Sequence, residues 1–151
     1  AWTVCRDRAL VALQFSGDQA FWKAHRRDTL FRQSVGLCAA LDHGKVPGFA
    51  LTVPTHDEPG HWARTFEDGV RWGQNSGVSA LNLADVLGAE TVKLVGFDLD
   101  GCTRDGEHHS ELEDMHRLFL DRFAEIAPKV RARVLVHGSL RSPLRRFWGD
   151  A

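Results

Sequence analysis

Hydrophobic residues recur at helical spacing in the middle of the chain. They predict an amphipathic helix whose buried side carries Val78, Leu81, Ala84 and Leu87. Gly88 follows directly and supplies a C-terminal stop. The next apolar run, Thr91 to Phe97 (TVKLVGF), predicts a buried strand. Residues 78–97 are therefore expected to fold as a helix followed by a strand.

The same order recurs further along the chain. Ser110 and the acidic residues after it predict the start of a second helix. Its expected inner stripe consists of Leu112, Met115, Phe119, Phe123 and Ile126. Pro128 ends this helix, and residues 133–136 (RVLV) predict another strand. Because a helix joins the two predicted strands, we expect them to be parallel, with helices covering the sheet.

The first half of the chain has weaker patterns. Residues 2–6 and 9–15 predict one or two short strands, and residues 18–33 predict a helix. Residues 45–55 predict a strand bracketed by two prolines, which favour an edge position. Residues 56–72 predict a loop with at most one helical turn. Together these elements indicate an α/β fold, with residues 1–151 forming a single domain.

Composition excludes some classes of partner. The chain has 151 residues, of which 43% are hydrophobic and 26% charged, and its formal net charge is -1. This balance gives no sign of a nucleic-acid partner or of attraction to a membrane surface. No apolar run approaches the roughly 18 residues of a membrane span. The three cysteines lack paired spacing, which indicates reduced thiols and a cytoplasmic protein.

The turn before the first predicted helix is a candidate binding site. Asn75, Ser76 and Gly77 stand where the first backbone N–H groups of a helix point outward without partners. With the positive end of the helix dipole, such groups attract a phosphate or another anion. A cluster of Gly, Asn and Ser at this position is also typical of a simple capped turn. Both interpretations remain open from the sequence.

Two further segments are expected at the same edge of the sheet. Asp98 ends one predicted strand, and His108 and His109 close the loop after it. Loops that follow parallel strands leave the sheet at one edge, so a carboxylate and an imidazole are expected beside the Asn75 turn. Histidine is the natural acid or base near neutral pH. A solvent-exposed loop histidine and a turn carboxylate are the plain alternatives.

Two other chemistries use the same segment. Six residues that can bind a metal ion fall within twelve positions, although they match no complete metal motif: Asp98, Asp100, Asp105, Glu107, His108 and His109. The sequence FDLDGCT at 97–103 is also similar to the nucleophile motif of haloacid-dehalogenase phosphatases, with Asp98 as nucleophile and Asp100 as acid/base. That family needs a later lysine and acidic pair, and only about fifty residues follow. We expect a solvated acidic turn and no tightly bound metal.

Residues 73–147 resemble a family of Rossmann-type proteins from bacteria and phages. The family comprises the DUF115 (MptE-like) proteins and the bacterial sialyltransferases of glycosyltransferase family 42. Its pattern begins with an N-S-G turn, a helix ending in L-G, and a strand ending in G-x-D. A catalytic histidine, a helix and a G-S-x-L turn complete it. The corresponding residues here are Asn75-Ser76-Gly77, Leu87-Gly88, Gly96-Phe97-Asp98, His109 and Gly138-Ser139.

The resemblance implies a Rossmann-like, three-layer fold with a mostly parallel sheet, and a protein that binds a nucleotide or nucleotide-sugar. Asn75, Ser76 and Gly77 would contact this ligand, Ser139 would line the nucleotide site, and His109 would be the general base. The donor would be a substrate, and no bound cofactor is implied. The family's first glycine-rich strand and its loop tyrosines are absent. The alternative is therefore a non-catalytic binding or structural module of phage or prophage origin.

Overall fold

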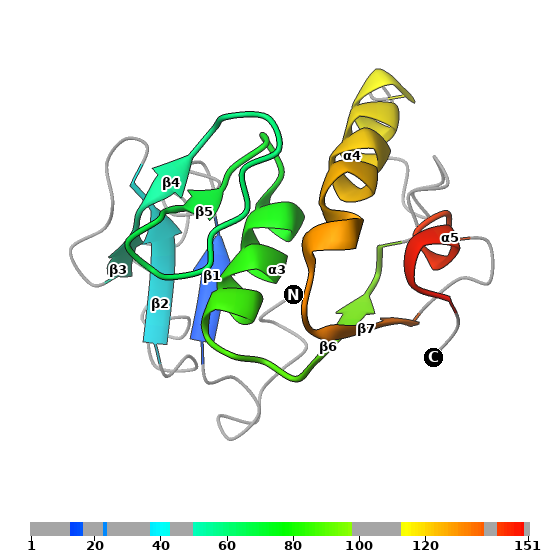
Figure 1. Ribbon diagram of the computed structural model, residues 1–151. Coiled ribbons are helices and arrows are strands. Elements are labelled where there is room, and N and C mark those ends of the chain that lie inside the picture. Colours follow the sequence, from blue (N-terminus) through cyan, green and yellow to red (C-terminus); the bar gives the residue numbers. More distant parts are fainter. Residues whose placement is uncertain are drawn as a thin grey trace.

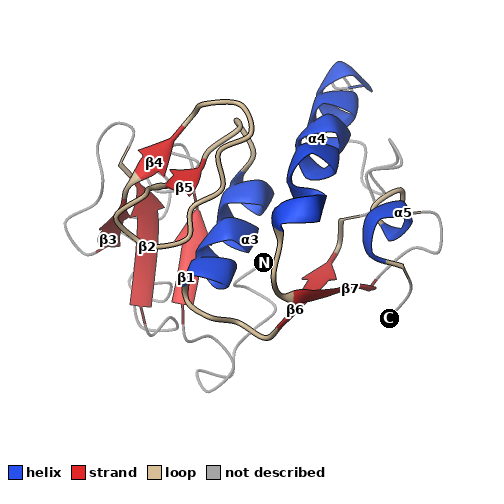
Figure 2. Cartoon of the chain, in the orientation of Figure 1, coloured by secondary structure: helices blue, strands red, loops and turns tan. Residues whose placement is uncertain are grey.

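Short parallel strands and the helices that cover them form the part of the chain that the structure describes. The computed structural model describes residues 13–16, 23, 37–42, 50–97, 113–137 and 142–149. Figures 1 and 2 show the elements: β1 (Leu13–Ser16), β2 (Leu37–Leu41), β3 (Ala50–Val53), β4 (Thr55–His56), β5 (Val70–Arg71), α3 (Ser76–Val86), β6 (Thr91–Val95), α4 (Glu113–Ile126), η2 (Ala127–Lys129), β7 (Arg133–His137) and α5 (Arg145–Trp148).

All strand pairings within these ranges are parallel. They form three separate ladders, β1-β2-β3, β4-β5 and β6-β7, where one mostly parallel sheet was expected. The parallel arrangement of β6 and β7 was predicted and is confirmed, with Thr91 opposite Arg133 and Val95 opposite His137. The chain is thus an α/β protein. No helix within the described ranges is long and apolar enough to cross a membrane.

The second half of the chain agrees well with its hydrophobic pattern. α3, β6, α4 and β7 each form within a few residues of their expected bounds. Phe123 and Ile126 of the predicted α4 stripe are buried. Two predictions of burial are wrong. Leu87 is 64% exposed because α3 ends at Val86. The strand expected to be buried is mostly exposed, since β6 buries Leu94 but leaves Thr91, Lys93 and Val95 at the surface. The predicted strand at 2–6 and nearly all of the predicted helix at 18–33 lie outside the described residues.

The segment from residue 45 to residue 72 differs from the prediction. The expected strand divides at Pro54, where the chain leaves β2 and joins a different neighbour. The Val53 carbonyl accepts from the Asp42 amide, whereas the Pro54 carbonyl accepts from the Val70 amide. β4 and β5 then pair in parallel where a loop was expected. Strands of two residues are too short for their alternation to be recognised in a sequence.

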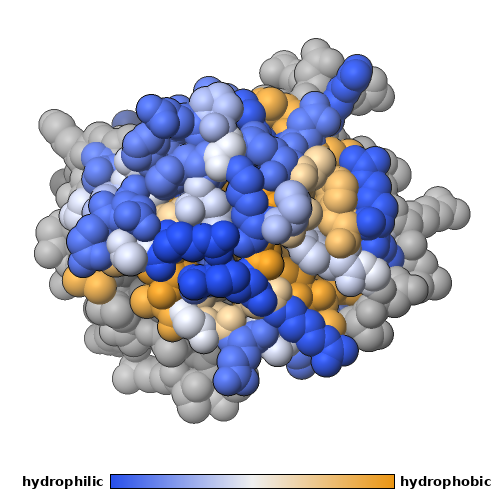
Figure 3. Space-filling view, viewed as in Figure 1, coloured by the Kyte–Doolittle hydropathy of each residue, from blue (hydrophilic) through white to orange (hydrophobic). Residues whose placement is uncertain are grey.

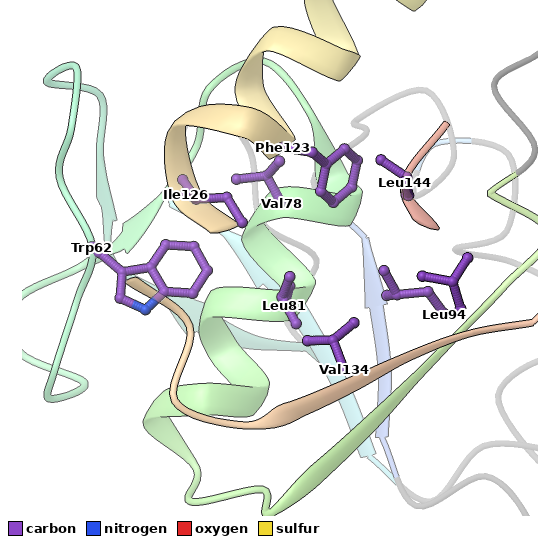
Figure 4. Packing of buried hydrophobic residues seen from close by; sticks show 9 residues of the cluster. Trp62, Val78, Leu81, Leu94, Phe123, Ile126, Val134 and Leu144 are labelled. Carbon is purple, nitrogen blue, oxygen red and sulfur yellow. The ribbon is translucent and has the colours of Figure 1, made fainter. Parts of the chain in front are cut away.

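α3 is the element that both halves of the molecule share. In Figure 1 it stands between the strands β1 to β5 on one side and α4, β6 and β7 on the other. Leu83 packs with Val53 and Val70 on the first side. The larger cluster on the second side, most of which Figure 4 labels, comprises Trp62, Val78, Leu81, Leu94, Phe123, Ile126, Val134, Val136 and Leu144. The helix is therefore buried along two faces.

A third face of α3 is polar and is also buried. Asn82 is fully buried. Its side-chain amide makes the hydrogen bonds to the backbone of the neighbouring loop that a paired strand would otherwise make. Its Oδ1 accepts from the amides of Ala63 (3.1 Å) and Arg71 (2.9 Å), while its Nδ2 donates to the Ala63 carbonyl (3.1 Å). Ser79 Oγ donates to the Arg71 carbonyl at 2.8 Å. These bonds hold residues 63–71 against the helix.

Asp85 continues this buried polar face near the end of α3. Its carboxylate accepts from the Trp62 indole (3.0 Å) and from the amides of Arg131 and Ala132 (3.1 Å each). Burial raises the pKa of Asp85, but the hydrogen bonds from Trp62 and the two amides outweigh burial and hold the pKa below its ordinary value. The charged carboxylate thus fixes both the loop and the connection that leads into β7.

We predict that Asn82→Ala is much more destabilising than Asn75→Ala. The first change leaves three buried backbone groups without partners, which costs at least about 3 kcal/mol. The second removes only a helix cap, which costs about 1 kcal/mol. Urea denaturation of both variants measures the difference in the free energy of unfolding. Equal losses would show that Asn82 does not hold the loop.

Candidate functional site

The start of α3 is held by the side chain of Asn75. This residue has extended backbone angles, φ -142° and ψ 108°, as expected for an N-cap. Its Oδ1 accepts from the amides of Gly77 (2.8 Å) and Val78 (3.3 Å). Its backbone carbonyl accepts from the amide of Ser79 at 3.1 Å. Asn75 itself is 8% exposed, so its side chain is packed into the structure.

These bonds differ from the expectation that the first amides of the helix lack partners. The amides of Gly77 and Val78 were expected to lack partners, but the Asn75 oxygen occupies both. A phosphate at this position must therefore compete with Asn75 or use the remaining amide of Ser76. The simple capped turn describes the observed geometry. The role of Asn75, Ser76 and Gly77 in binding a ligand stays a prediction.

Phe97, the last residue of the predicted strand, packs on Gly77. A Cβ atom built on Gly77 would lie 2.6 Å from Phe97 Cε1 and 3.1 Å from Phe97 Cζ, far inside normal contact. The same ring packs edge-on against Phe123 of α4, with centroids 5.7 Å apart. Glycine at position 77 thus allows the end of β6 to lie directly against the start of α3. This contact is a sufficient structural reason for a glycine at position 77, so the glycine by itself does not indicate a bound ligand.

Ser142 brings the segment after β7 to the same place. Its hydroxyl donates to the Phe97 carbonyl at 2.7 Å, and the residue is 4% exposed. The carbonyl of Ser142 accepts from the Arg145 amide as α5 begins. Three segments distant in sequence therefore meet, namely the start of α3, the end of β6 and the segment that follows β7.

The predicted site residues divide into two groups. Asn75, Ser76 and Gly77 are described and lie at this meeting point. The predicted catalytic residues Asp98 and His109, together with Ser139, fall outside the described residues. Their placement opposite Asn75 therefore stays a prediction. Of their described neighbours, Phe97 stands directly before Asp98 and Ser142 three residues after Ser139, and these two residues are joined by a hydrogen bond.

No local pattern in the sequence predicts the roles of Phe97 and Ser142. Phe97 appeared only as the end of a strand. Ser142 stands next to a proline in a segment without periodicity, so its sequence offered no signal of burial. Both roles depend on the approach of β6 to α3, which a local pattern does not encode.

A second polar cluster joins the loop after β4 to the end of α4. Arg71 is buried, and its Nη1 donates to the carbonyl (2.7 Å) and carboxylate (3.1 Å) of Asp57. Glu125 accepts from the Gly60 amide and lies 3.6 Å from Arg71 Nε. Burial raises the pKa of Glu125, but the Gly60 amide and Arg71 outweigh it and lower the pKa. This arrangement serves to anchor the loop.

No known protein helps to assign a role to these residues. No protein family, curated protein or solved structure matches the chain. Within the described ranges, no three His, Cys, Asp or Glu side chains gather as metal ligands. The acidic and histidine-rich residues 98–109, which are the sequence's candidates for a metal or a phosphatase site, lie outside those ranges.

We predict that Gly77→Ala destabilises the protein by about 1–3 kcal/mol, because the new methyl group displaces the Phe97 ring. Phe97→Leu in the same chain should recover part of this loss, giving a clear coupling energy in a double-mutant cycle. Chemical denaturation of the four proteins measures it. An increase in stability of about 0.5–1 kcal/mol, as expected for an open helical glycine, would contradict the contact.

Proposed function

We propose that this protein binds a nucleotide or nucleotide-sugar at the edge of the sheet where β6 and β7 end, as a glycosyltransferase-like protein. The observation that carries the proposal is the meeting of three segments at that edge. Gly77 contacts Phe97, and Ser142 donates to the Phe97 carbonyl. Asp98 and Ser139 are close in sequence to these contacts. The described residues next to two of the predicted ligand-binding segments thus lie beside the start of α3.

The strand arrangement supports a Rossmann-like fold for this site. The ladder β1-β2-β3 and the ladder β6-β7 are both parallel, as in the two halves of a doubly wound sheet. Ligands of such sheets bind beyond the carboxyl ends of the strands, next to a helix start. α3 begins at the corresponding end of β6, since Gly77 packs on Phe97. A crevice at this position is the expected nucleotide site.

The proposed chemistry needs no bound metal. His109 takes the proton from an acceptor hydroxyl, and the resulting oxygen attacks the anomeric carbon of the donor sugar. The bond between that carbon and the phosphate oxygen breaks, and the nucleotide leaves with the bonding electrons. Ser139 lines the nucleotide site, and Asp98 faces His109 across it. The start of α3 stabilises the phosphate charge through the remaining amide of Ser76, and through the Gly77 amide once the phosphate displaces the Asn75 oxygen.

One observation favours a second candidate. The Asn75 side chain already satisfies the amides of Gly77 and Val78, and Phe97 covers Gly77. A helix start arranged in this way is complete without a ligand. The alternative is therefore a non-catalytic binding or structural module with the same fold, in which the Asn75 turn only caps the helix.

Calorimetry with CMP, UMP, GDP and ATP tests the proposal on two matched variants. Asn75→Asp and Asn75→Ser both keep a capping oxygen, so both should fold. Asn75→Asp adds a negative charge at the proposed phosphate position and should weaken nucleotide binding at least about tenfold, which corresponds to 1.4 kcal/mol. Asn75→Ser should change it little.

His109→Ala distinguishes the enzyme from the binding module. It should leave nucleotide affinity unchanged and abolish transfer of the sugar. Turnover that survives His109→Ala would remove the general base from the mechanism. If none of the four nucleotides binds at millimolar concentration, the proposed function is wrong.

A further inference from the structure

A cavity opens at the opposite end of α3 from Asn75. It has a volume of about 360 Å³ and is lined by the end of the helix, by residues 88 and 89, and by the side chains of Arg64, Asp85, Glu90 and Arg131. This volume lies at the lower end of the range for small-molecule sites. In Figure 3, strongly hydrophilic side chains lie beside hydrophobic residues over the lower end of α3. The cavity suits a small, charged ligand.

Two arginines at this cavity are held by one buried carboxylate. Arg131 Nε lies 3.3 Å from Asp85 Oδ2, and Arg131 Nη2 donates to the Asp85 carbonyl at 3.0 Å. Arg64 approaches the same Oδ2 from elsewhere in the chain, with its Nη1 at 3.7 Å. Arg64 Nη1 also donates to the Lys129 carbonyl at 3.2 Å. Both guanidinium groups are thus fixed although their side chains are half-exposed.

The two guanidinium groups keep unused hydrogen-bond donors. Asp85 already accepts from the Trp62 indole and two backbone amides, so its carboxylate is shared among several donors. Arg131 Nη1, Arg64 Nη2 and Arg64 Nε make no hydrogen bond to the described residues. Glu90, the other acid at the cavity, forms no ion pair within the described part of the chain. Two arginines and two acids therefore line the cavity, and of the two acids only Asp85 is paired with the arginines in the described part of the chain.

We propose that this cavity binds a small oxyanion, a phosphate or carboxylate group, between Arg64 and Arg131. A planar guanidinium group presents parallel donors that match two oxygens of such an anion. Because Asp85 already holds both arginines, little side-chain entropy is lost when the anion binds. This second site is independent of the proposed nucleotide site, since it uses none of the same residues.

NMR titration with inorganic phosphate and, separately, malonate tests the site at constant ionic strength. The amides of Gly88 and Ala89 and the Nε–H of Arg131 should shift together and saturate. Arg64→Gln should weaken the binding at least about fivefold, because it removes one guanidinium group from the pair. Glu90→Gln should strengthen it, because an exposed negative charge at the cavity is removed.

Arg133→Gln is the matched control, since it removes the same charge from an exposed residue that does not line the cavity. It should leave the affinity unchanged. Tighter binding of phosphate than of malonate assigns a phosphate ligand, and the reverse order assigns a carboxylate; either supports the proposal. Shifts that do not saturate, or equal loss in Arg64→Gln and Arg133→Gln, would overturn it. Asn75→Asp should have no effect on this titration.

Discussion

The buried polar side chains of α3 are the constraint on which the rest of the described structure depends. Asn82 and Asp85 supply hydrogen bonds to two segments that have no strand or helix partners at those positions. A buried backbone amide without a partner is costly, so these segments are stable only against this face of the helix. The apolar faces of α3 fix its depth in the core, and its polar face fixes the path of the chain around it.

This fixed helix determines what lies at each of its ends. At the start, Asn75 and Gly77 meet the end of β6 through Phe97, and Ser142 joins them from the segment after β7. At the other end, Asp85 holds Arg64 and Arg131 around a cavity. Both candidate sites are consequences of the same packing. The site at the start of α3 depends on the close approach of Phe97 to Gly77. The cavity at the other end depends on the Asp85 carboxylate, which two arginines share.

The hydrophobic pattern predicted the elements that carry a clear apolar stripe or apolar run in the sequence. α3, β6, α4 and β7 followed from it, and the helix crossover between β6 and β7 correctly implied that they are parallel. The candidate turn at Asn75 was also recognisable, because Asn and Gly before an apolar run are typical of a helix start. Ser142 gave no signal, since its partner is a carbonyl 45 residues away.

The polar face of α3 shows why the remainder was not predictable. Ser79, Asn82 and Asp85 recur every three residues, a spacing that normally indicates the solvent side of a helix. Here that side is covered by residues 62–71 and by the connection to β7. The covering loop contains strands of only two residues, which leave no periodic pattern. The local sequence therefore gives no sign of the segments that cover Ser79, Asn82 and Asp85.

Native-state hydrogen exchange of individual amides tests the central role of this polar face most directly. The amides of Ala63, Arg131 and Ala132 lie outside strands and helices, but they are bonded to Asn82 or Asp85. They should exchange as slowly as amides inside α3, through global unfolding. The amide of Thr65, bonded to the exposed Asp68, should exchange quickly. Fast exchange of Ala63 and Ala132, equal to that of Thr65, would contradict the central role of Asn82 and Asp85.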